Sequence, residues 1–319
     1  MELPERQELS AVVERYARFL ARSGREVGTR PLVLPNGDFF PDRFDRDEPS
    51  VARLVERMLQ HAGMDDVPLK VSVVDEDGPE APHDGGCSSG CQVPAAMAGS
   101  TPRLVDDGQG WTLNVPAYEL AHPVVLTTLA ARALGHVFLV ETLPSGARIE
   151  APAAVTADVA SVALGFGALL LEGAYIYSKS CGGPSVASVT QVPLAELAVL
   201  TALFAAMGDH PLRRALAELG TTQSAALGEA HEWAKSNPTL VERLRRDPAR
   251  VAAGDYSLEE AKPWLLRVFG KKSKRDEIPF EMPAVARPVK ARAPDPKEDE
   301  LRALVEETLS ELGADASAE

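Results

Sequence analysis

Residues 126–141 read LTTLAARALGHVFLVE, and this stretch decides the fold. Apolar side chains occupy most of its positions, which favours a helix buried in the core. Arg132 and His136 interrupt the pattern four residues apart, so they share one face of that helix. A cation inside an apolar helix needs a counter-charge, because burying it unpaired costs several kcal/mol.

The rest of the chain surrounds this helix with further helices and a few strands. Before it, helical spacing is expected over 5–24 and 50–63, and short strands are expected at the start of 30–44, over 67–77 and over 111–120. Residues 78–110 have the composition of a loop. Three apolar helices are then expected, followed by a more polar helical region to about residue 270; the three are 122–141, 153–178 and 193–207. These elements predict a predominantly helical α+β fold with a small sheet.

Composition restricts the classes of partner. The formal net charge of −14 argues against a nucleic acid or an anionic membrane. MELPERQELS lacks the apolar segment of a signal peptide, and the apolar run Val159–Leu171 is shorter than the roughly 20 residues that a membrane span needs. The three cysteines are an odd number, which argues against a disulfide framework. We therefore expect a cytoplasmic protein of bacterial type.

Five segments occur in a serial order that resembles one family. They are LPNGDFFPDRF (34–44), GGCSSGCQ (85–92), LAARALGHVFL (129–139), AAVTADVASVALGFGAL (153–169) and VPLAELAVLTALFAAMGD (192–209). Together they span roughly residues 31–230 and resemble an uncharacterised bacterial family with a zincin-like core, whose long helix carries the metallopeptidase motif H-E-x-x-H. The resemblance implies a zincin-like helical core for this chain.

The same resemblance implies that the metal site has lost its ligands. The first metal-binding His of the family falls on Arg132, the catalytic Glu on Ala133, and the second His on His136. The Glu that completes the ligand set falls on Ala154, and the Asp of the family's T-D motif falls on Asp158. Zinc hydrolysis needs three protein ligands and a carboxylate base, and Arg has no lone pair to donate. This alignment implies a pseudo-metallopeptidase without catalytic activity.

Two interpretations of Arg132 remain open at this point. In the first, Arg132 forms an ion pair with Asp158 where the family holds its metal, and His136 donates a hydrogen bond into the same cluster. In the second, Arg132 extends along the helix to solvent. A separation beyond about 6 Å between Arg132 and Asp158 would exclude the first interpretation.

A second set of metal-binding residue types lies in two Gly-rich loops. His83, Cys87 and Cys91 form H-x3-C-x3-C, and Cys181 stands in SCGGPS. Four such donors can hold a structural zinc. Alternatively, the cysteines are small, partly buried apolar side chains.

The last fifty residues change in character. Residues 271–295 are rich in Pro, Ala and charged residues and predict a flexible linker after a domain at 1–270. Residues 296–313 predict one isolated amphipathic helix, which cannot bury its apolar stripe alone. The helix either packs on its own domain or binds a protein partner. Its stripe is Leu301, Leu304, Val305, Leu309 and Leu312.

The sequence therefore favours a non-catalytic, zincin-like protein that binds a protein partner or acts as a scaffold. A hydrolase that uses a relocated Cys/His metal site is the alternative, and a structural subunit of a larger assembly is a third possibility. Apart from a structural zinc, no cofactor is expected.

Overall fold

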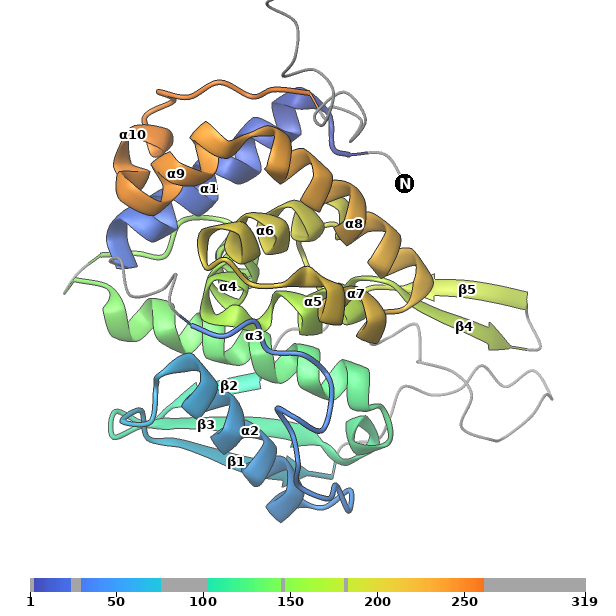
Figure 1. The fold of residues 1–319 in the computed structure, drawn as a ribbon. Coiled ribbons are helices and arrows are strands. Elements are labelled where there is room, and N and C mark those ends of the chain that lie inside the picture. The colour runs from blue at the N-terminus through green and yellow to red at the C-terminus, as the bar shows by residue number, and fades with distance from the viewer. Residues whose placement is uncertain (1–2, 24–29, 76–102, 145–146, 181–182, 261–319) are drawn as a thin grey trace, which may run out of the picture. The chain divides into compact units, whose positions relative to one another are not determined.

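The protein is described by a computed structural model over residues 3–23, 30–75, 103–144, 147–180 and 183–260 (Figure 1). The chain divides into one compact unit over Met1–Lys271 and a second over Lys272–Glu319. The expected linker at 271–295 and the terminal helix at 296–313 lie outside the described residues.

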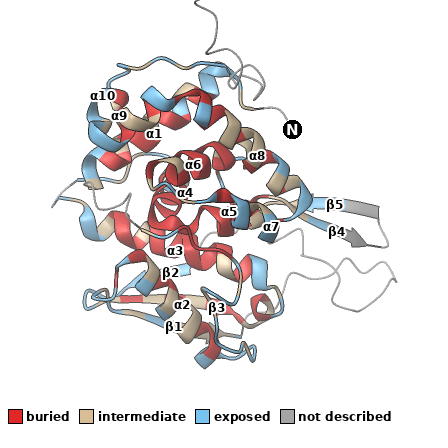
Figure 2. Ribbon diagram, in the orientation of Figure 1, coloured by how far each residue is buried: buried red, intermediate tan, exposed pale blue. Residues whose placement is uncertain are grey.

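The described part is a predominantly helical α+β fold, as predicted. Apolar helices form its centre, and Figure 2 shows them almost wholly buried. Helices α1, α9 and α10 lie on one side of this centre, and α2 and a three-stranded sheet lie on the other (Figure 1). The helices are α1 Arg6–Ser23, α2 Glu48–Ala62, α3 Pro123–Thr142, α4 Ala153–Ser161, α5 Gly167–Ala174, α6 Leu194–Met207, α7 Leu212–Glu218, α8 Thr221–Ser236, α9 Pro238–Arg246 and α10 Pro248–Ala252.

The three-stranded sheet contains β1 (Leu69–Val74), β2 (Arg103–Asp106) and β3 (Trp111–Pro116) in the order β1-β3-β2. β1 is parallel to β3, and β2 is antiparallel to it. The expected strands at 67–77 and 111–120 are thus present, while β2 lies in a segment that was predicted to be loop. A single turn of 3-10 helix, Ala117–Ala121, leads from β3 into α3.

The prediction of a strand at the start of 30–44 is wrong. Residues 32–34 are buried and have no partner strand among the described residues. Instead, the Val33 amide donates a hydrogen bond to the Gly165 carbonyl at 2.9 Å. This segment therefore packs against the helical core and not at an edge of the sheet.

The helix expected over 153–178 is broken. α4 ends at Ser161, a π-helical turn (Val162–Phe166) follows, and α5 begins at Gly167. Gly165 has φ +98°, and a Cβ there would lie 2.1 Å from the Pro31 carbonyl oxygen, so glycine is required. The helix also stops earlier than expected, since β4 (Ile176–Ser180) pairs antiparallel with β5 (Gly183–Ala187) in a hairpin that projects from the body (Figure 1).

Two helical segments are long and apolar enough to cross a membrane, Pro123–Thr142 and Ala153–Ala174. The length argument made for Val159–Leu171 is therefore wrong, because its helical segment continues at both ends. Most of each segment, 72% and 89% of the apolar window, is buried inside the structure. A buried core helix passes the same test of length and composition, so neither segment argues for a membrane.

Candidate functional site

Arg132 and Asp158 form a buried ion pair between α3 and α4. Nε of Arg132 donates to Oδ1 of Asp158 at 2.6 Å. The two side chains are only 1% and 0% exposed. The predicted ion pair is present, and the alternative in which Arg132 extends to solvent is wrong.

Backbone groups of the segment before α6 complete the hydrogen bonding of this pair. Nη1 of Arg132 donates to the Val189 carbonyl at 2.6 Å. Oδ2 of Asp158 accepts the amides of Gln191 at 2.6 Å and Val192 at 3.0 Å. The pair therefore links α3, α4 and the entry to α6. These partners could not be predicted from the sequence, because a backbone amide or carbonyl has no residue-specific signal.

Small residues bring α3 and α4 close together next to the pair. A Cβ at Gly135 would lie 2.2 Å from Oγ of Ser161 and 2.4 Å from the Ala157 carbonyl oxygen. The Ser161 hydroxyl lies 2.8 Å from the carbonyl oxygens of both Ala131 and Ala157. This close approach holds Arg132 and Asp158 within hydrogen-bond distance.

His136 lies one turn after Arg132 and does not join the pair. Its half-buried ring meets the Trp111 indole edge to face, with the ring centroids 6.3 Å apart. Trp111 in turn donates its indole N–H to Glu141 at 2.7 Å. No hydrogen bond joins His136 to Arg132 or Asp158, so that part of the prediction is wrong. Burial lowers the pKa of His136 below its ordinary value, which favours a neutral ring at neutral pH.

The residues that the zincin-like resemblance aligns with a metal site do not fit a zinc ion. Ala133 is buried and Ala154 is half-buried, and neither has a donor atom. Both carboxylate oxygens of Asp158 already accept hydrogen bonds. Over the described ranges, no three His, Cys, Asp or Glu residues lie close enough to hold a metal. His136 alone cannot supply the three ligands of a catalytic zinc.

Two sets of predicted site residues lie outside the described residues. One is the Cys/His set for a structural zinc, and the other is the apolar stripe of the terminal helix. They are His83, Cys87, Cys91 and Cys181, and Leu301, Leu304, Val305, Leu309 and Leu312.

Comparisons with protein-family models, curated proteins and solved structures find no match. The zincin-like resemblance therefore stays a prediction. Function is inferred below from residues and their geometry.

A cavity of about 550 Å³ lies away from the Arg132–Asp158 pair. Its wall combines the loop at 35–44, α2, the first turns of α3, α5 and the end of α7. Its lining does not include Arg132, Ala133, His136, Ala154 or Asp158. Its apolar lining is Pro35, Phe40, Phe44, Leu54, Pro123, Val124, Leu126 and Leu169.

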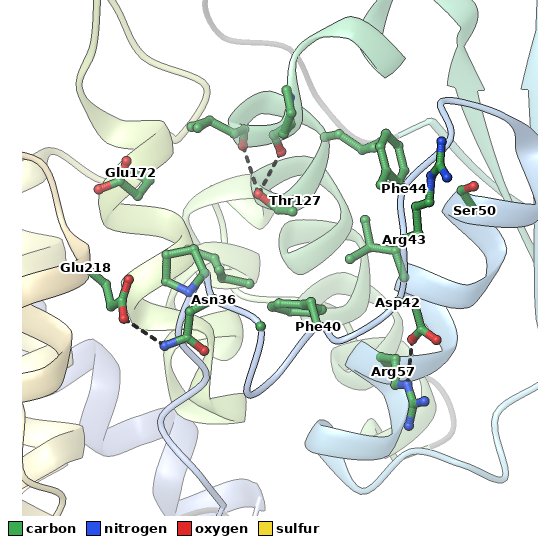
Figure 3. A pocket seen from close by; sticks show the side chains of 17 residues that line it. Asn36, Phe40, Asp42, Arg43, Phe44, Ser50, Arg57, Thr127, Glu172 and Glu218 are labelled. Atoms are coloured by element: carbon green, nitrogen blue, oxygen red, sulfur yellow. Dashed lines mark hydrogen bonds and ion pairs between the residues drawn. The ribbon is translucent and has the colours of Figure 1, made fainter.

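Charged groups stand at opposite sides of this cavity (Figure 3). On one side, Arg57 pairs with Asp42 at 3.0 Å, next to Arg43. On the other side lie Glu172 and Glu218. Phe40 and Phe44, two of three Phe residues in this turn-rich loop, were a signal in the sequence for an apolar pocket.

Proposed function

We propose that this protein is a non-catalytic pseudo-metallopeptidase that acts as a protein-binding or scaffold protein. The buried Arg132–Asp158 pair is the single observation that carries the proposal. The zincin-like resemblance aligns this guanidinium with the first metal-binding His of a metallopeptidase helix, which supports the proposal. A permanent cation at that position repels a divalent metal and offers it no lone pair.

The Arg132–Asp158 pair connects helices as a bound metal ion would, but it supplies none of the metal's chemistry. A bound metal ion cross-links the helices that supply its ligands, and here the pair joins α3, α4 and the entry to α6. It has no open position for a water molecule. Ala133 supplies no carboxylate to take a proton from water, so neither requirement for zinc hydrolysis is met.

The binding role is assigned to the terminal segment. The helix predicted at 296–313 follows a Pro-rich and Ala-rich stretch, and its apolar stripe would need a partner surface, such as a groove of another protein. Deleting residues 286–319 should selectively abolish co-purification of a partner from cells that express the tagged chain. Equal recovery of every co-purified protein from both chains would contradict a docking helix.

Zinc content tests the loss of the metal site. Purified without a His-tag, the wild-type chain should contain less than about a tenth of an equivalent of zinc and should cleave no peptide, because a catalytic site needs three ligands. The double substitution Arg132→His, Ala154→Glu restores a His-His-Glu set with His136. This variant should bind about one equivalent of zinc, because Asp158 can then orient the new imidazole.

Wild-type protein that carries stoichiometric zinc and loses it on substitution of His136 would overturn the proposal. Zinc that is retained by His136→Ala but lost when Cys87, Cys91 and Cys181 are replaced would instead identify the relocated Cys/His site. Peptide hydrolysis that depends on that zinc would establish the hydrolase alternative.

A further inference from the structure

A second cavity adjoins the one beside the 35–44 loop. Its volume is about 460 Å³, and it lies between β4 and the N-terminal end of α8. Both cavities are lined by Val124 and Glu172, so they adjoin at these two residues. The two cavities together are called the groove below.

Exposed apolar side chains gather at the groove. Four large apolar side chains are exposed in the described part of the chain. Val124, 36% exposed, lines both cavities, and Tyr177, 58% exposed, lines the second. Val186, 54% exposed, stands directly opposite Tyr177 on the hairpin. The groove and the adjoining face of the hairpin thus form one apolar surface, which is typical of a protein interaction site.

The positive charges that line the groove are already neutralised. Arg43 pairs with Asp45 at 2.7 Å, and Arg57 pairs with Asp42 at 3.0 Å. Each guanidinium is therefore balanced by a neighbouring carboxylate, and the two arginines add little net positive charge to the groove.

The two carboxylates at the other side have no cationic partner among the described residues. Glu172 accepts the Gly220 amide at 2.9 Å, and Glu218 accepts the Asn36 side-chain amide at 3.0 Å. Both donors are neutral, so two negative charges face the groove uncompensated (Figure 3). Charge complementarity calls for a partner with a basic group at this place.

We infer that the groove binds a polypeptide segment in which Lys or Arg residues stand between apolar residues, an inference that rests on the proposed protein-binding function. Each cavity alone already has the volume of a small-ligand pocket. A single ligand that fills both is therefore larger than a small molecule, which favours a polypeptide segment. The basic side chains donate to Glu172 and Glu218. The apolar side chains pack on Phe40, Val124 and Tyr177.

Peptide selection on the full-length protein tests this assignment. The probe is a phage-displayed library of random peptides of about twelve residues, long enough to span both cavities. Selected peptides should carry basic residues flanked by apolar ones. Their fluorescein-labelled forms should bind Glu172→Gln/Glu218→Gln about tenfold more weakly than wild type, as expected for the loss of two charge contacts. Gln still accepts the two neutral hydrogen bonds, so the fold is kept.

Matched variants separate the groove from the general acidity of the chain. Asp65 and Asp66 are exposed and line neither cavity, so Asp65→Asn/Asp66→Asn removes the same charge and should leave peptide binding unchanged. On the apolar side, Tyr177→Ser should weaken binding several-fold. Val105→Ser, at an apolar position outside the groove that is 49% exposed, should not.

Three outcomes would overturn the inference: no enriched peptide, enriched peptides without basic residues, or equal loss of binding in the two acidic double variants. None of these results depends on the zinc content or on the terminal helix. Failure of the groove is therefore distinguishable from failure of the proposed function.

Discussion

At the scale of single residues, the central observation is the burial and pairing of Arg132. A guanidinium that is 1% exposed is stable only if its hydrogen bonds and charge are matched, and Asp158 and the Val189 carbonyl match them. Asp158 is satisfied in turn by two backbone amides. Removing Arg132 therefore leaves the Asp158 carboxylate buried without this cation.

Arg132→Met should lower the free energy of unfolding by about 3–5 kcal/mol, since it strands a buried carboxylate. The double variant Arg132→Met/Asp158→Asn should lie closer to wild type than the single variant, because the stranded charge is gone. Urea unfolding followed by circular dichroism measures both differences.

The partly exposed pair Arg18–Glu150 provides the control. Its side chains are 38% and 27% exposed, so Arg18→Met should cost no more than about 1 kcal/mol. A loss for Arg132→Met as small as that of Arg18→Met would contradict the role given to the buried pair.

His136 predicts a pH dependence of stability. Burial depresses its pKa in the folded chain below the ordinary 6.5 of the unfolded chain. Between these two values the unfolded chain binds a proton that the folded chain does not, so stability falls as pH falls below 6.5 toward the folded pKa. His136→Gln should therefore lose less stability than wild type between about pH 7.5 and about pH 5.5 in urea unfolding.

In the His136→Gln variant, His122 still makes stability depend on pH. Burial, with a smaller contribution from the charge of Arg46, lowers the pKa of His122 as well, and the same sign applies to it. An identical loss of stability in wild type and His136→Gln would show that His136 titrates alike in the folded and unfolded chains.

At the scale of elements, the distance at which two helices pack depends on individual glycines. Gly135 on α3 faces α4, where a Cβ would lie 2.2 Å from Oγ of Ser161. Gly135→Ala should therefore lower the free energy of unfolding by about 1–3 kcal/mol, as overpacking does. Gly228 on α8 has no atom closer than 4.0 Å to an added Cβ, so Gly228→Ala should raise it by about 0.5–1 kcal/mol through helix propensity.

Thermal unfolding of these two variants gives opposite shifts of the midpoint if the contact between α3 and α4 is as close as described. A stabilised Gly135→Ala variant would mean that the two helices stand farther apart, and the geometry that supports the Arg132–Asp158 pair would then be wrong.

At the scale of the whole molecule, the unit Met1–Lys271 has its own extensive core and should fold alone. A chain that ends at Lys271 should unfold within about 2 °C of the full-length midpoint, because a domain with its own core needs no further segment. A clearly lower midpoint would favour the interpretation in which the terminal helix packs on its own domain.

Local patterns were enough to predict that the central segments are buried and helical, but not the break at Val162–Phe166. A stretch as apolar as 126–141 must be buried, and a cation within it must be paired, whatever the tertiary arrangement. The strands β1 and β3 followed from alternating side chains. β2 and the β4–β5 hairpin were missed because short strands depend on their pairing partners more than on their own residues.

The sequence by itself determined that a buried helix would contain a cation in need of a counter-charge, since residue identity alone gives Arg132 its charge and the apolar stretch around it predicts burial. Only the tertiary structure decided what surrounds it: backbone groups of residues 189–192 around the pair, and His136 turned to Trp111. The groove is likewise a tertiary property. Its walls come from segments more than a hundred residues apart, and only folding brings the uncompensated charges of Glu172 and Glu218 to its side.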